Sequence, residues 1–282
     1  MKPTEFTRLT MAIDAGVAVL TLNRPDIRNA WAGRTALEYR WALHHCHVDP
    51  AVRVVVLTGE RDFCVGADHN ALDDIGGSNG SYHVERAPLP DFPDDTPAEM
   101  RRNHAYPLAV SVPIIAAIAG GCAGAGFLVA SYADIRFADD DARIASSFAS
   151  LGLPAEYGLG WLLPRIVGTA NAAQLLYSPA PISARRAAEL GWVQRVCASG
   201  TAVTEAVDYA RALAAGSAAG SLHMMKRQIH FDSMLPFGDA YHRSVADMNT
   251  ALKSPEFKEG VRALREKRRP KFLSPMAIEE PR

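Results

Sequence analysis

The chain has 282 residues, of which 48% are hydrophobic and 22% are charged, a composition typical of a globular protein. Its 30 basic and 31 acidic residues leave a formal net charge of -1, so charge gives no indication of a nucleic-acid partner. The four cysteines are far apart and form no C-x-x-C pair, which argues against a zinc-binding or disulfide framework.

Two features bear on where the protein acts. The first eight residues are polar and do not resemble a secretion signal. Residues 110–133 are the most apolar stretch, but Pro113 and four glycines interrupt them, which indicates a strand, a turn and a helix inside a core rather than a membrane span. We therefore expect a cytoplasmic protein with no membrane partner.

Strand and helix patterns alternate over the first 200 residues. Short apolar or β-branched runs predict strands at residues 9–13, 17–22, 52–57, 114–119, 135–138, 143–145 and 193–196. Helical patterns occupy residues 34–48, 158–167 and 169–177, and Ser183 is the expected N-cap of a further helix that ends at Gly191. Residues 69–97 are polar and rich in glycine, proline and aspartate, and are predicted to form a lid over a binding site.

The last third of the chain shows helical patterns alone. They lie at residues 202–215, 222–231, 237–252 and 255–268. The sequence therefore predicts an α/β domain over residues 1–200, followed by a helical region over residues 201–282.

Two glycine-containing turns each follow a predicted buried strand. The first is FCVGAD at residues 63–68, and the second is GGCAGAGF at residues 120–127, which opens a helix. Glycine lets another group approach the backbone N–H closely, and a helix N-terminus favours negative charge. Together the turns can form an oxyanion hole, although either turn alone is more often a tight connection between a strand and a helix.

Other short motifs do not fit their usual context. A dinucleotide-binding fingerprint that starts at Gly124 would need glycine at position 129, where the chain has Val129, and no Walker lysine follows. Residues 76–80 match G-x-S-x-G, but they lie in the polar segment rather than between a strand and a helix, so a thioesterase is their one remaining use. His44 and His47 share a helix face without a set of ligands to complete a site, and we expect no metal.

From about residue 9 to residue 272, the chain resembles the crotonase superfamily, also called the enoyl-CoA hydratase/isomerase family. The resemblance rests on the order and spacing of segments such as LNRP at 22–25, RNA at 28–30, GAD at 66–68, PIIAAI at 113–118, ADI at 133–135, LPRIVG at 163–168 and ISA at 182–184. It implies an α/β spiral of repeated ββα units with a C-terminal helical trimerisation region, in a homotrimer or a hexamer made of two trimers. It also implies an acyl-CoA thioester substrate, with coenzyme A as part of that substrate and no separate cofactor.

The same resemblance assigns site residues. The two oxyanion donors fall on the backbone N–H groups of Ala67 and Ala125. The positions that hold coenzyme A are Arg24, Arg28, Ala67, Asp68, Lys271 and Phe272, the last two reaching the CoA of a neighbouring subunit. Taken by themselves, these basic residues equally fit a solvated surface. The acyl pocket is expected to include Leu128, Phe148, Tyr157 and Trp161.

The two glutamates that hydratases of this family use are missing from their usual positions. Leu128 and Phe148 stand there, and residues 120–133 and 143–155 contain no acidic side chain. Glu156 matches the acid of family members that work with one carboxylate, such as enoyl-CoA isomerases, and apolar neighbours are expected to raise its pKa. Without the resemblance, a carboxylate before a helix is explained by the helix dipole alone.

We therefore expect an acyl-CoA enzyme that stabilises a thioester enolate and shifts a double bond with a single glutamate. Three alternatives stay open. Asp73 or Asp74 of the polar segment can supply a second acid for hydration when that segment closes. The chain can also be an acyl-CoA binding protein with impaired catalysis, or a thioesterase.

Overall fold

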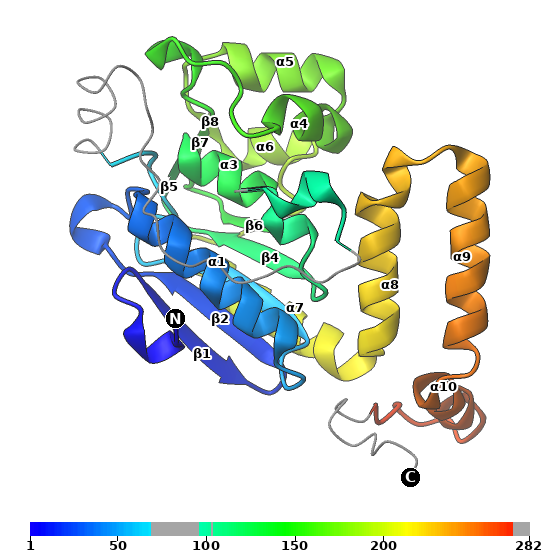
Figure 1. Cartoon of the computed structure of the whole chain (residues 1–282). Helices are drawn as coiled ribbons and strands as arrows, with labels where there is room; N and C mark the ends of the chain where they lie inside the picture. Colours follow the sequence, from blue (N-terminus) through cyan, green and yellow to red (C-terminus); the bar gives the residue numbers. More distant parts are fainter. Residues whose placement is uncertain (69–95, 103, 273–282) are drawn as a thin grey trace.

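The computed structural model describes residues 1–68, 96–102 and 104–272, and its largest element is a six-stranded sheet (Figure 1). The first two strands form an antiparallel hairpin, and each later pair of neighbours is parallel. From one edge to the other, the strands are β1 (Leu9–Asp14), β2 (Val17–Leu22), β3 (Val54–Gly59), β4 (Ile114–Ile118), β6 (Ile135–Asp139) and β9 (Arg195–Cys197).

β3 shows how the sheet is buried. All six of its residues are buried, which matches the continuous apolar run in the sequence. Successive side chains of a strand point to opposite faces, so Val55 and Leu57 belong to one core and Val54 and Val56 to another. The sheet is therefore covered on both sides.

Two helices provide that cover. α1 (Gly33–Val48) contributes Leu37 and Leu43 to the core that contains Val55. α7 (Ala202–Gly216) covers the opposite face with alanines spaced four residues apart, at positions 202, 206, 210 and 214. Residues four apart share one helix face, and small side chains let the helix approach the sheet closely. Figure 1 shows α1 and α7 on opposite sides of the sheet.

A second, three-stranded sheet lies beside the first. It consists of β5 (Gly121–Ala123), β7 (Arg143–Ala145) and β8 (Ile182–Ser183), with β7 in the centre. The helices around it are α3 (Ala125–Ser131), α4 (Leu159–Val167), α5 (Thr169–Tyr177) and α6 (Ala184–Glu189). β5 begins three residues after the end of β4, so the second glycine-rich turn itself contains a strand. This places the turn between the two sheets.

The remaining helices extend to one side of the sheets (Figure 1). They are α8 (Ala219–His230), α9 (Phe237–Ala251) and α10 (Pro255–Arg265). The structure is thus mixed α/β with a C-terminal helical region, as predicted. α7 follows residue 200 but packs on the main sheet, so the helices that lie away from the sheets begin at α8. The division of the chain into regions 1–200 and 201–282 stays a prediction.

A buried ion pair joins α8 to the strands. Lys226 Nζ lies 2.9 Å from Asp134 Oδ2, and His230 Nε2 lies 2.8 Å from Asp134 Oδ1. Burial on its own raises the pKa of Asp134, but Lys226 and His230 together lower it to about 2. No helix in the described part of the chain is both long enough and apolar enough to cross a membrane.

Candidate active site

The two glycine-containing turns lie side by side, joined through their backbones. The N–H of Cys64 donates to the carbonyl of Gly121 at 3.1 Å, and the N–H of Ala123 donates to the carbonyl of Cys64 at 2.9 Å. These two bonds form a parallel bridge between residues 64 and 122. The turn at residues 63–68 therefore runs alongside β5 and ends next to the start of α3.

The hydrogen bonds around Ala67 fix the direction of its N–H. Trp31 donates to the carbonyl of Gly66 at 2.7 Å and accepts from the N–H of Asp68 at 2.9 Å. In such a parallel bridge, the residue between the two bonded ones directs its own N–H to the opposite side. Ala125 is the first residue of α3, where helical N–H groups have no intrahelical acceptor. Among the described residues, neither Ala67 nor Ala125 donates to a backbone carbonyl.

Glycine is required where the two turns touch. A Cβ on Gly126 would lie 2.1 Å from the carbonyl oxygen of Cys64, far inside contact distance. Gly124 has a φ of +50°, and a Cβ there would lie 3.3 Å from Cα of Gly66. The close packing of the two turns therefore requires glycine at these two positions.

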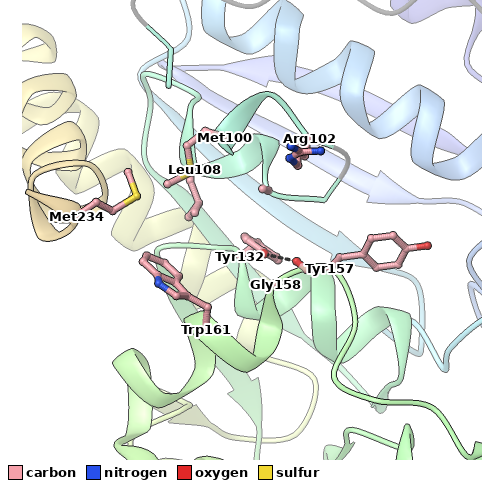
Figure 2. Close-up of a pocket in the computed structure, with 9 residues that line it drawn as sticks. Met100, Arg102, Leu108, Tyr132, Tyr157, Gly158, Trp161 and Met234 are labelled. Atoms are coloured by element: carbon pink, nitrogen blue, oxygen red, sulfur yellow. Dashed lines mark hydrogen bonds between the residues drawn. The ribbon is translucent and has the colours of Figure 1, made fainter. Parts of the chain in front are cut away.

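Glu156 lies just before α4 and is half-buried. Burial raises the pKa of its carboxyl group, the direction that a general base requires. The following residue, Tyr157, has a φ of +45°, which is unusual for a tyrosine. Tyr132, at the end of α3, stabilises this backbone by donating its hydroxyl to the carbonyl of Tyr157 at 2.5 Å, drawn as a dashed line in Figure 2. Glu156 is thus tied to the helix that begins at Ala125.

His104 forms a second link between the parts of the site. Its ring packs on that of Tyr157 with 4.2 Å between centroids, and lies 6.3 Å from the ring of Trp31. Burial lowers the pKa of His104 to about 4, so the imidazole is neutral at physiological pH. Neither His104 nor Tyr132 carries a sequence signal for this role, because each meets its partner only after distant segments fold together.

A cavity of about 390 Å³ extends from the residues that follow Glu156 (Figure 2). Of the predicted acyl-pocket residues, Tyr157 and Trp161 line it. Leu128 and Phe148 are instead buried in the main core, and neither is among the described residues that line this cavity; their contact with an acyl group stays a prediction. The other lining residues were not predicted from the sequence, and they include Met100, Arg102, Leu108, Tyr132 and Met234.

The predicted CoA-binding arginines pair with carboxylates of the same chain. Arg24 Nη1 lies 2.9 Å from Asp68 Oδ2, and both side chains are largely buried. Arg28 donates twice to Asp62 at 2.8 Å, which raises the pKa of Arg28 and lowers that of Asp62. Because the N–H of Gly121 also donates to Asp62, at 2.6 Å, Arg28 stabilises the contact between the two turns.

The structure does not bring Lys271 and Phe272 to the turns of their own chain. The N–H of Lys271 donates to Glu259 of α10 at 2.7 Å, and Figure 1 shows α10 far from β5. A role for them at the site of a neighbouring subunit stays a prediction. Asp73, Asp74 and the G-x-S-x-G match at residues 76–80 lie outside the described residues.

His44 and His47 do not form a metal site with other described residues. The Nδ1 atom of His47 instead lies 2.9 Å from the hydroxyl of Ser111.

Comparison with known proteins supports the resemblance seen in the sequence. A family model for enoyl-CoA hydratase/isomerase matches residues 12–275, nearly the whole chain. The chain belongs to the enoyl-CoA hydratase/isomerase family. A solved structure of a probable enoyl-CoA hydratase/isomerase from Mycobacterium abscessus superposes with a TM-score of 0.82 at 32% identity, covering 94% of this chain and 98% of that one. The chain therefore has the predicted crotonase fold.

Relatives within the enoyl-CoA hydratase/isomerase family carry names of two reactions. A probable enoyl-CoA hydratase of Bacillus subtilis (strain 168) is 32% identical over 269 residues, which is 94% of this chain and 98% of the relative. The 1,2-epoxyphenylacetyl-CoA isomerase of Escherichia coli (strain K12) is 32% identical over 270 residues, which is 92% of this chain and 96% of the relative. Family membership therefore does not choose between hydration and isomerisation.

Proposed function

We propose that this protein shifts the double bond of an enoyl-CoA thioester, with Glu156 as its single proton carrier. The observation that carries the proposal is the half-buried Glu156 carboxylate, whose pKa is raised by burial. The turns that carry Ala67 and Ala125 support the same chemistry, because their N–H groups suit a thioester oxygen that gains negative charge.

The proposed reaction needs one base and one oxyanion site. Glu156 removes a proton from Cα of a 3-enoyl-CoA, and the electron pair spreads over the carbon chain and the thioester oxygen. The N–H groups of Ala67 and Ala125 stabilise that oxygen while the enolate lasts. Glu156, now protonated, returns the proton to Cγ, which leaves a 2-enoyl-CoA and the original carboxylate. No water is consumed, and no cofactor is needed.

Hydration is the alternative that the name of the Bacillus subtilis relative favours. It needs a second acid to deliver a proton while a water attacks Cβ. At the positions of the hydratase glutamates, this chain has Leu128 and Phe148, which are 0% and 3% exposed. Neither side chain can transfer a proton, so isomerisation fits these positions better. The Escherichia coli relative is also named an isomerase, but the substrate in its name is an epoxide and not an enoyl-CoA.

We also propose a homotrimer or a hexamer. α9 has no buried residue in the single chain, and it exposes Phe237 and Met248, which are 84% and 60% accessible. Exposed apolar side chains along one helix are typical of an interface between subunits. In such an assembly, Lys271 and Phe272 would contact the coenzyme A bound to a neighbour.

Product analysis tests the proposed reaction. The purified protein is incubated with 3-enoyl-CoA and 2-enoyl-CoA substrates of several chain lengths, and the products are separated by liquid chromatography with mass detection. We expect 2-enoyl-CoA from 3-enoyl-CoA, and a loss of about 10²–10⁴ in rate in Glu156→Gln. A 3-hydroxyacyl-CoA as the main product would identify a hydratase, and free coenzyme A would identify a thioesterase.

A further inference from the structure

A second cavity lies directly behind the acyl pocket. It measures about 410 Å³ and is bounded by α4, α8 and the start of β6. Leu108 and Trp161 line both cavities, each contributing to the wall between them. Figure 2 shows Trp161 on the α4 side of the acyl pocket, on the opposite side from Tyr157. An acyl chain that enters this pocket at Tyr157 would therefore meet Trp161 at its opposite side.

Contacts within α4 hold the indole of Trp161 in this position. The guanidinium of Arg165, one helical turn later, lies over the indole ring at 3.7 Å from its centroid. Arg165 Nη1 also donates to the carbonyl of Trp161 at 2.8 Å. At an exposed site, a cation over an indole face contributes about 0.5–1 kcal/mol, which favours this orientation of the ring. The wall between the cavities is therefore formed by an indole that is 39% exposed and that Arg165 favours in this position.

The second cavity differs from the acyl pocket in charge. Arg136 of β6 lines it and is 3% exposed. Its Nε donates to the carbonyl of Trp192 and its Nη1 to the carbonyl of Ala133, whereas Nη2 donates to no group within the described chain. Arg165 lines the same cavity, and so does Asp134, whose carboxylate is already paired with Lys226 of α8. The cavity is thus cationic, with an unused donor.

We propose that Trp161 sets the length of the acyl group that this protein accepts, by closing the acyl pocket against the cationic cavity. This inference rests on the proposed function, because it needs an acyl-CoA in the first cavity. An apolar chain that passed Trp161 would meet the buried charge of Arg136, which a hydrocarbon cannot solvate. A chain that ends in a carboxylate could instead pair with Arg136 and Arg165. Removal of the indole joins the two cavities and makes that position accessible.

The test measures the binding of saturated acyl-CoAs, so it does not depend on turnover. Probes of four to sixteen carbons, ending in a methyl or in a carboxylate group, are titrated calorimetrically into the wild type and into Trp161→Ala. In the wild type, we expect affinity to rise by about fourfold per methylene and then to stop rising at one length. In Trp161→Ala, we expect the rise to continue beyond that length for chains that end in a carboxylate, and little further rise for chains that end in a methyl group.

Ile229→Ala is the matched control, because Ile229 lines the second cavity alone and is 68% exposed. It should bind each probe as the wild type does. Trp161→Leu is used if Trp161→Ala loses its circular-dichroism signal, since leucine keeps an apolar side chain while opening most of the wall. The same length dependence in wild type and variant, or equal gains for the two kinds of chain end, would overturn the role of Trp161. A wild type that binds none of the probes would instead contradict the proposed function itself.

Discussion

Gly126→Ala tests whether backbone contact between the two turns creates the site. The added Cβ would lie 2.1 Å from the carbonyl oxygen of Cys64 and 2.8 Å from its Cβ, whereas ordinary contacts begin at 3.4 Å. The turn and α3 must therefore separate by about 1.3 Å, the difference between 3.4 Å and 2.1 Å. Because the Cys64 carbonyl belongs to the backbone, no rotation of a side chain can relieve the clash.

This displacement has two expected consequences. Overpacking of a close contact costs about 1–3 kcal/mol of unfolding free energy, which urea denaturation measures. A misplacement of about 1 Å at a reacting centre can cost about 10²-fold in rate, so we expect kcat/KM for enoyl-CoA isomerisation to fall by at least that factor. The urea denaturation curve gives the fraction of the variant that is folded. The rate can therefore be measured where the variant is fully folded, which separates the loss of rate from the loss of stability.

Gly260→Ala is the control for this substitution. Gly260 also lies inside a helix, α10, but a Cβ there would meet no atom within 4 Å. Replacing a helical glycine by alanine at such a position is expected to stabilise the protein by about 0.5–1 kcal/mol and to leave the rate unchanged. Wild-type rate and wild-type stability in Gly126→Ala would refute the claim that the two turns must touch.

Three further predictions concern Glu156 and two residues of the same site. Burial raises the pKa of Glu156, so kcat/KM should begin to fall on acidification at a pH above the ordinary glutamate pKa of about 4.3. The folded state also loses stability as pH rises through that raised pKa, because the ionised carboxylate is buried. Glu156→Gln should therefore unfold at a slightly higher temperature than the wild type at neutral pH. An acid limb at the ordinary value would contradict this. Tyr132→Phe removes the hydrogen bond to the carbonyl of Tyr157. This should lower the free energy of unfolding, measured in urea, by about 1 kcal/mol, and should lower kcat more than the affinity for acyl-CoA. An unchanged kcat would show that the bond does not position the Glu156 segment. Burial lowers the pKa of His104 to about 4, against about 6.5 in the unfolded chain. The contribution of His104 to the free energy of unfolding is therefore complete above pH 6.5 and is lost as pH falls toward 4, so the difference in that free energy between wild type and His104→Gln should change by about 3 kcal/mol over this range. A difference that stays constant would contradict the burial of the imidazole.

Much of the fold follows from sequence periodicity. The predicted strands at 17–22 and 143–145 and the predicted helix at 169–177 match β2, β7 and α5 residue for residue. Ser183 caps α6 as expected, since its hydroxyl accepts from the N–H of Arg186 at 3.2 Å. In each case a local signal, such as β-branched residues or a capping side chain, decides the structure.

Elements that depend on a distant partner could not be predicted. β5 is three residues long and lies inside a glycine-rich turn, where it becomes a strand only by pairing with β7. β8 has two residues and pairs with the same strand. β5 contains no β-branched or aromatic residue, and β8 has only two residues, so neither sequence carries a strand pattern.

Some features of the candidate site could likewise be predicted from local sequence, whereas others depend on contacts between distant segments. Its glycines could be recognised because only glycine permits the backbone to approach so closely, and the raised pKa of Glu156 agrees with its apolar neighbours. The pairing of Arg24 with Asp68 was not predicted, since ion pairs between distant segments leave no trace in spacing. Met234 reaches the acyl cavity from the segment after α8, and the helical pattern gave no reason to expect it there.

The central claim is that the protein isomerises an enoyl-CoA with a single glutamate. The most direct test is to identify the product that the wild type forms from a 3-enoyl-CoA in deuterated water. We expect a 2-enoyl-CoA that carries deuterium only to the extent that Glu156 exchanges its proton with solvent between the two transfers. In Glu156→Gln, we expect the same product to form about 10²–10⁴ times more slowly. A 3-hydroxyacyl-CoA, or an isomerisation rate in Glu156→Gln equal to that of the wild type, would contradict a single-glutamate isomerase.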